Sequence, residues 1–174
     1  MRVLGVDPGL TRCGVGVVEG VPGRPCTLVA YYVIHTDPAD DLSLRLLHLD
    51  RTLTDLVAEH QPRSVAVERV FSQHNVRTVM GTAQASAVAV LAGARAGLPV
   101  STYTPSEVKA AITGSGQADK AQVTSMVTRL LRLDAPPRPA DAADALALAI
   151  CHIWRGGTQS KLAAAVAKTR GGAR

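Results

Sequence analysis

Residues 64–68, SVAVE, form an apolar run without the polar–apolar alternation that a half-exposed strand shows. A strand of this kind is buried on both faces, so it needs a sheet with helices packed above and below it. Residues 41–60 precede it with leucines on one helical stripe, and Pro62 separates the two elements. The combination predicts an α/β fold.

The other segments extend this pattern along the chain. Two turns, each marked by a Pro-Gly pair, join three predicted N-terminal strands: 2–7, 15–19 and 27–36. The segments after SVAVE are read in order as helix, strand, helix and helix: 76–96, 98–103, 105–112 and 119–133. Because the two later strands require helical crossovers, we expect a five-stranded mixed sheet flanked by helices, with its first three strands antiparallel.

A last helix is predicted from the sequence PADAADALALAICH at 139–152, where Pro139 suits the first turn. Everything between Asp144 and Cys151 is apolar and belongs in a protein interior. Asp141 and Asp144 stand three residues apart and therefore project from one helical face. They either act as favourable charges near the positive helix end or hold a cation, since an isolated buried carboxylate is costly.

Two more acids stand at predicted strand ends: Asp7 closes the first strand and Glu68 closes the fourth. Taken singly, Asp7 could begin a β-turn before Pro8-Gly9, and Glu68 could be a solvated strand end. If the two strands are neighbours, however, both acids can approach Asp141 and Asp144, and four carboxylates at close range need a cation. An oxygen-only ligand set fits Mg²⁺ or Mn²⁺ better than zinc.

The composition limits the class of protein. The chain has 174 residues, of which 47% are hydrophobic and 19% charged, as in an ordinary globular domain. No apolar run reaches a membrane-spanning length and no signal peptide is visible, so we expect a cytoplasmic protein without a membrane partner. Three widely spaced cysteines suit a reducing compartment and argue against a zinc or disulfide framework: Cys13, Cys26 and Cys151.

The charge is unevenly distributed. Residues 155–174 contain five cations and no acids, which accounts for the net charge of +5. We therefore expect one domain at 1–154 followed by a basic, flexible tail at 155–174. Within the domain, residues 69–132 contain seven cations and two acids. This excess suggests a polyanionic partner such as nucleic acid, although a basic solvated surface explains it equally well.

Four segments together resemble the RuvC family of Holliday-junction resolvases, in order and at the expected spacing: GVDPGLTRCGVGV, VAVERVFSQHN, VKAAITGSGQADKAQV and DAADALALAI. The resemblance covers about residues 2–153. It implies a ribonuclease-H-like fold and a structure-selective endonuclease that resolves four-way DNA junctions in recombination and repair. It further implies paired, symmetric, metal-dependent cuts that leave 5′-phosphate and 3′-hydroxyl ends.

The resemblance also assigns site residues by position. Asp7, Glu68, Asp141 and Asp144 match the family's catalytic, metal-binding tetrad, for which two Mg²⁺ ions are expected and Mn²⁺ should substitute. Lys109 and Lys120 match basic positions that contact DNA, and Phe71 matches an aromatic residue thought to work against junction bases. Each lysine could instead be a mobile surface charge, and Phe71 could be a staple for the following helix. His74 and His152 are interpreted as structural.

The implied partners are four-way junction DNA, a second copy of the chain, and the RuvA–RuvB branch-migration complex. Small residues along the helix at 76–96 could pack at the twofold axis of a homodimer or only against their own sheet. Two alternative functions remain at this point. One is another ribonuclease-H-like nuclease, acting on RNA–DNA hybrids or related to pre-resolvases. The other is an actin-like nucleotide-binding module, which needs two such lobes around its nucleotide.

Overall fold

The computed structural model describes the backbone of residues 1–70 and 76–171 and the side chains of residues 1–70 and 79–156. Phe71 and His74 lie outside the described residues. The strands are β1 Arg2–Asp7, β2 Arg12–Glu19, β3 Thr27–His35, β4 Ser64–Glu68 and β5 Val100–Tyr103. The helices are α1 Leu42–His60, α2 Val76–Arg95, α3 Pro105–Thr113, α4 Lys120–Leu130 and α5 Ala140–Gly171.

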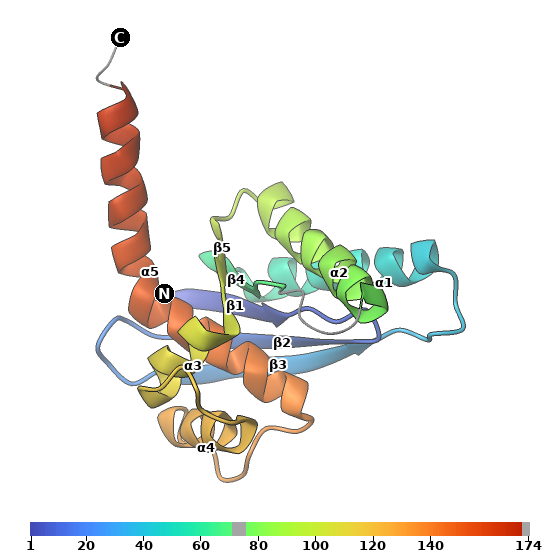
Figure 1. Cartoon of the computed structure of the whole chain (residues 1–174), viewed down its shortest axis with the longest axis horizontal. Helices are drawn as coiled ribbons and strands as arrows, with labels where there is room; N and C mark the ends of the chain where they lie inside the picture. Colours follow the sequence, from blue (N-terminus) through green and yellow to red (C-terminus); the bar gives the residue numbers. More distant parts are fainter. Residues whose placement is uncertain (71–75, 172–174) are drawn as a thin grey trace.

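The strands form a single five-stranded sheet in the order β3-β2-β1-β4-β5 (Figure 1). β2 pairs antiparallel with both β1 and β3, whereas β4 pairs parallel with β1 and with β5. The predicted mixed sheet is therefore confirmed, including its three antiparallel N-terminal strands. β1 and β4 are neighbours at its centre, so Asp7 and Glu68 end adjacent parallel strands.

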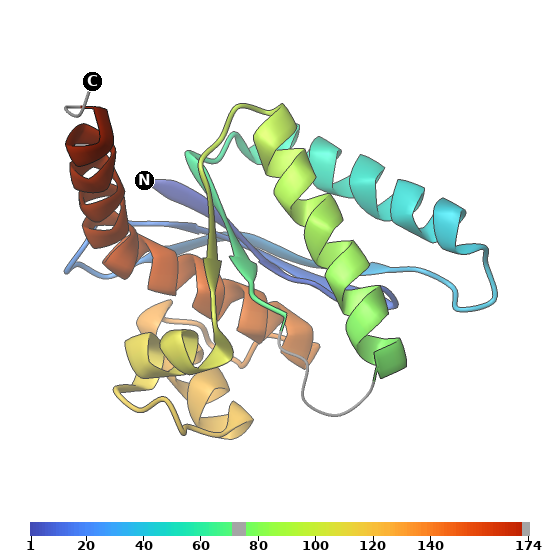
Figure 2. The same cartoon turned by 45° about the horizontal axis from the view of Figure 1, so that its top comes forward.

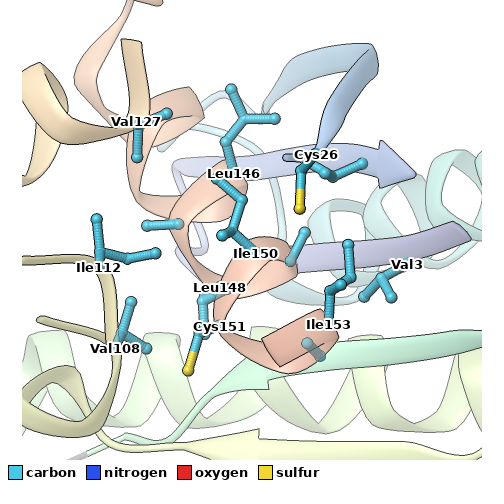
Figure 3. Packing of buried hydrophobic residues seen from close by; sticks show 14 of the residues in the cluster. Val3, Cys26, Val108, Ile112, Val127, Leu146, Leu148, Ile150, Cys151 and Ile153 are labelled. Carbon is cyan, nitrogen blue, oxygen red and sulfur yellow. The ribbon is translucent and has the colours of Figure 1, made fainter. Parts of the chain in front are cut away.

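Helices cover both faces of the sheet, α1 and α2 on one side and α3, α4 and α5 on the other (Figure 2). Strand alternation divides the core between the two faces. Leu4 and Val6 of β1 pack with the α1 leucines and α2 alanines, whereas Val3 packs with α5. Figure 3 shows the α5 side, where Leu146 and Ile150 lie among residues of the neighbouring elements.

α5 lies unusually close to the sheet because glycines stand beneath it. A Cβ atom on Gly5 would lie 2.2 Å from the Ala145 carbonyl oxygen, and one on Gly14 would lie 2.1 Å from the Asp141 carbonyl oxygen. A Cβ atom on Gly16 would lie 2.7 Å from the Leu146 backbone nitrogen. Only glycine permits this approach of helix and strand backbones. The first turns of α5 are therefore fixed over β1 and β2.

The middle of α5 is attached to the sheet by His152. Its Nε2 lies 2.9 Å from Ser64 Oγ of β4, and its Nδ1 lies 2.8 Å from the Tyr103 hydroxyl of β5. Burial lowers the pKa of His152, which favours the neutral ring with one donor and one acceptor nitrogen. The interpretation of His152 as structural agrees with these contacts.

α5 continues well past the boundary expected at residues 154 and 155, and its last part extends away from the sheet (Figure 1). The alanine-rich sequence LAAAVAK favours helix, which gives a local reason for the continuation. The division into a domain at 1–154 and a separate tail stays a prediction. Within the described residues, no helix combines the length and apolar character needed to cross a bilayer.

The small residues of α2 pack against their own sheet. Ala85, Ala89 and Ala92 are buried in the core between α2 and the sheet, and a Cβ on Gly93 would meet Val65 and Val100 side chains. Of the two alternatives for this stripe, the structure favours intramolecular packing. Among the described side chains of α2, those from residue 79 on, the opposite side is exposed and apolar at five positions: Met80, Ala83, Ala87, Leu91 and Ala94.

Candidate active site

The inner part of the site consists of the two strand-end carboxylates, Asp7 and Glu68, called the inner carboxylates below. Ala66, two residues before Glu68, belongs to the core beneath α5, and Val67 belongs to the opposite core. The same alternation in β1 places Asp7 on the side of Gly5, against α5. Both inner carboxylates therefore lie on the α5 side of the sheet, at the carboxyl ends of its central parallel strands.

Burial and mutual repulsion perturb the inner carboxylates. The pKa of Asp7 is raised to about 8, first by burial, then by the charge of Glu68 and a hydrogen bond with it, and further by Asp144 and Asp141. Burial also raises the pKa of Glu68. A proton shared between Asp7 and Glu68 relieves the repulsion of two buried carboxylates.

The outer carboxylates, Asp141 and Asp144, stand on the first turns of α5, and each faces a cation of the chain. Lys120 Nζ donates a hydrogen bond to Asp144 Oδ2 at 3.2 Å, and Asp144 raises the pKa of this lysine. Arg12 Nε lies 3.2 Å from Asp141 Oδ2. This oxygen is buried, and it accepts no hydrogen bond from the described residues, so its contact with Arg12 is an ion pair without hydrogen-bond alignment.

A cavity of about 310 Å³ opens beside these groups. Three carboxylates line it, Asp7, Glu68 and Asp144, together with Lys109 and Lys120. Local capping positions the two lysines. α3, which carries Lys109, begins with a capping box between Thr104 and Glu107, and α4 begins at Lys120 with a capping box between Asp119 and Gln122. Cations from α3 and from the first residue of α4 thus face carboxylates from two strand ends and α5.

The donor chemistry of the four carboxylates suits a hard divalent cation. All are oxygen ligands, the inner pair is buried and mutually repulsive, and Asp141 has a buried oxygen that accepts no hydrogen bond from residues 1–70 or 79–156. Within the described residues, however, no three His, Cys, Asp or Glu side chains are grouped so that they could hold a metal ion. The outer carboxylates contact Arg12 and Lys120 instead. The ligand types fit a metal, but their assembly requires these ion pairs to rearrange.

Sequence reasoning missed Arg12. It assigned residues 8–14 to a turn, whereas β2 begins at Arg12, which pairs with His35 of β3. The pairing with β3 extends β2 toward the site, and Gly14 then brings Asp141 within reach of Arg12. The only local signal was a cation close to Asp7 in sequence, which does not identify its partner. Phe71 was assigned a role at the junction, but it lies outside the described residues.

Comparisons with known proteins identify relatives over nearly the whole chain. The family model described as crossover junction endodeoxyribonuclease RuvC matches residues 3–152. The crossover junction endodeoxyribonuclease RuvC of Salinispora arenicola is 83% identical over 172 residues, which is 99% of this chain and 98% of that relative. The corresponding protein of Streptomyces griseus is 68% identical over 98% of this chain and 83% of its own length.

A solved structure shares the same fold. The structure of Thermus thermophilus RuvC superimposes with a TM-score of 0.84 at 34% identity, covering 91% of this chain and 97% of that one. The complex of T. thermophilus RuvC with a Holliday junction substrate gives a TM-score of 0.85 at 33% identity, covering 90% and 94%. The fold is ribonuclease-H-like. Sequence and structure agree, and the chain belongs to the RuvC family of crossover junction endodeoxyribonucleases.

Proposed function

We propose that this chain is a crossover junction endodeoxyribonuclease that resolves four-way DNA junctions by metal-dependent phosphodiester hydrolysis, in recombination and DNA repair. The observation that carries the proposal is the 310 Å³ cavity in which Asp7, Glu68 and Asp144 face Lys109 and Lys120. Carboxylates can hold cations and lysines can contact phosphates, so one cavity offers both halves of a phosphodiesterase site. The relative solved with a Holliday junction substrate supports the choice of DNA.

The four carboxylates would hold Mg²⁺, with Mn²⁺ able to substitute, as two ions per site. Bound divalent ions supply an activated water and stabilise the leaving oxygen. The chain's own residues position the substrate. Lys109 and Lys120 would hold DNA phosphates in the cavity, and the close packing of α5 on Gly5 and Gly14 keeps Asp141 and Asp144 in register with the strand ends. The products are 5′-phosphate and 3′-hydroxyl ends.

Resolution of a four-way junction needs two cuts in opposed strands, so the active form is a homodimer. The exposed apolar stripe of α2 supports this assembly, since Met80 and Leu91 are 57% and 45% exposed. Phe71 would stack on a base at the junction centre. The junction would be delivered by the RuvA–RuvB branch-migration complex in the cytoplasm.

The test is to incubate the protein with three synthetic substrates: a four-way junction, a linear duplex of the same sequence, and an RNA–DNA hybrid. Each is incubated with Mg²⁺, with Mn²⁺ and with EDTA. We expect symmetric cuts in the junction, little cleavage of the linear duplex, and no cleavage in EDTA. Equal cleavage of plain duplex, or a preference for the hybrid, would contradict the proposal and favour another ribonuclease-H-like nuclease.

A further inference from the structure

A second cavity, of about 460 Å³, lies on the other side of the carboxylates. Its lining includes Thr11, Arg12, Arg45 and Thr82, and it reaches Asp141. A smaller cavity of about 270 Å³ adjoins it through Thr82 and contains Asp7 and Glu68, which also line the 310 Å³ cavity with Lys109 and Lys120. The shared lining residues place the three cavities in a row along the carboxyl ends of β1 and β4.

Cations line both ends of this row, and Arg69 also lines the middle cavity. Lys109 and Lys120 stand at one end, the carboxylates lie between, and Arg12 and Arg45 stand at the other end. A strand of DNA laid along the row would place its cleaved phosphate at the carboxylates and its neighbouring phosphates at the two cationic ends. The lysine end has a proposed role, whereas the arginine end has had none.

Arg12 is available for such a contact. Its side chain is 56% exposed, and its Nε lies 3.2 Å from Asp141 Oδ2. Its two terminal nitrogens donate no hydrogen bond to any side chain that the structure describes, and a guanidinium can grip a phosphate with two parallel N–H donors. Gly14, two residues along β2, fixes its distance from α5.

Arg45 is held in the same cavity by neutral partners. Its Nε donates to Thr36 Oγ1 at 2.8 Å and its Nη2 donates to Thr11 Oγ1 at 2.9 Å. Among residues 1–70 and 79–156, no carboxylate forms an ion pair with Arg45. Two guanidinium groups therefore face one acid, Asp141, which leaves the cavity with an excess of positive charge suited to an anion.

We propose that the cavity between Arg12 and Arg45 is a phosphate-binding subsite for a DNA phosphate adjacent to the cleaved one, on the side opposite Lys109 and Lys120. This inference rests on the proposed function and adds a second contact to the same strand. Arg12 acts as a positioning residue here: it holds the strand and, through Asp141, connects the phosphate contact to the carboxylates.

The test measures binding of a synthetic four-way junction in EDTA at several salt concentrations, so that cleavage does not contribute. Arg12→Gln should weaken binding by about tenfold and reduce the salt slope by about one. Arg51→Gln is the matched control, because Arg51 is an exposed arginine of α1 that lines neither this cavity nor the 310 Å³ one. It should change the affinity by less than about twofold.

A double-mutant cycle separates phosphate binding from simple neutralisation of Asp141. If Arg12 binds phosphate, Arg12→Gln weakens binding by a similar factor in the Asp141→Asn background. If Arg12 only neutralises Asp141, its effect vanishes there and the inference is wrong. Arg12→Lys keeps the charge but not the two parallel N–H donors, so it should bind with intermediate affinity. It replaces Arg12→Gln in the test if Arg12→Gln has a lowered melting temperature.

The outcomes distinguish this inference from the proposed function. If Arg12→Gln binds the junction as tightly as the parent, or loses no more affinity than Arg51→Gln does, the subsite is wrong. Preferential junction binding by the parent would still support a resolvase in that case. A parent protein that binds linear duplex as well as a four-way junction would overturn the proposed function and the subsite with it.

Discussion

The inner and outer carboxylates of the site differ in whether a cation of the chain forms an ion pair with them. Asp7 and Glu68 are buried at strand ends, face each other, and have raised pKa values. Asp141 and Asp144 stand on a helix, and each lies 3.2 Å from a cationic nitrogen, of Arg12 and Lys120 respectively. The outer pair forms ion pairs with cations of the chain, whereas burial favours the protonated form of the inner pair.

This difference indicates how the site would work. A buried pair of carboxylates that forms no ion pair with the described residues is destabilising when ionised, so it favours any divalent ion that replaces the proton. The cations that pair with the outer carboxylates, Arg12 and Lys120, have largely exposed side chains and can turn toward phosphates at modest cost, because ion pairs with exposed partners contribute little stability. The inner pair would thus favour metal binding. The cations that leave the outer pair when metal binds would become available to DNA phosphates.

The largest effect is expected from breaking the inner pair. Asp7→Asn keeps the shape and turn-forming capacity of the side chain but removes a charge and a ligand. Cleavage of a four-way junction in Mg²⁺ should fall about a thousandfold, which corresponds to about 4 kcal/mol of barrier. Junction binding in EDTA should persist, because Lys109 and Lys120 still line the cavity and can contact phosphates. A folded variant with near-parental cleavage would exclude Asp7 from the chemistry.

The next effect tests the helix that carries the outer pair. Gly14→Ala places a Cβ 2.1 Å from the Asp141 carbonyl oxygen, so α5 must move away from β2. We expect the free energy of unfolding to fall by about 3 kcal/mol, measured by chemical denaturation, with reduced cleavage.

Gly81→Ala in α2 is the control for Gly14→Ala. Its Cβ would meet only the Leu10 side chain at 3.4 Å, and alanine favours helix, so its stability should be unchanged or up to about 1 kcal/mol higher. Equal free energies of unfolding of the two variants would show that the close packing of α5 on Gly14 does not fix the position of the outer carboxylates.

A smaller effect is expected from removing an outer cation. Lys120→Ala should lower cleavage by about tenfold and reduce the salt slope of junction binding by about one. The control is Arg24→Ala, at an exposed loop position away from the three cavities. If both variants have the parental rate and salt slope, Lys120 is a solvated surface charge.

Much of this arrangement could be predicted from the sequence, since strand ends and helix starts are local properties. The run SVAVE indicated a doubly covered strand, and the acids at 7 and 68 were expected together because parallel neighbours end at one edge. The partners of the outer pair could not be predicted. Arg12 meets Asp141 only because β2 begins earlier than its apolar run and glycines bring α5 close, and both depend on tertiary packing.

The central claim is that ionisation of the buried inner carboxylates is unfavourable unless a cation binds them. The dependence of stability on pH tests this claim most directly. The pKa of Asp7 is raised from 3.8 to about 8, so the native state binds more protons than the unfolded state between these values. Ionisation therefore opposes folding, and stability is lost as the pH rises through this range. Asn at position 7 cannot ionise, so the parent should lose stability with rising pH relative to Asp7→Asn.

The measurement is the free energy of unfolding of the parent and Asp7→Asn from pH 5 to pH 8, in EDTA and in Mg²⁺. In EDTA the free energy of unfolding of Asp7→Asn should rise relative to that of the parent as the pH rises, and Asp7→Asn should be the more stable protein at pH 8. Mg²⁺ should raise the free energy of unfolding of the parent enough to remove this difference, and it should raise that of Asp7→Asn much less. A difference between the two proteins that is independent of pH in EDTA, or a parent that Mg²⁺ does not stabilise, would contradict the account.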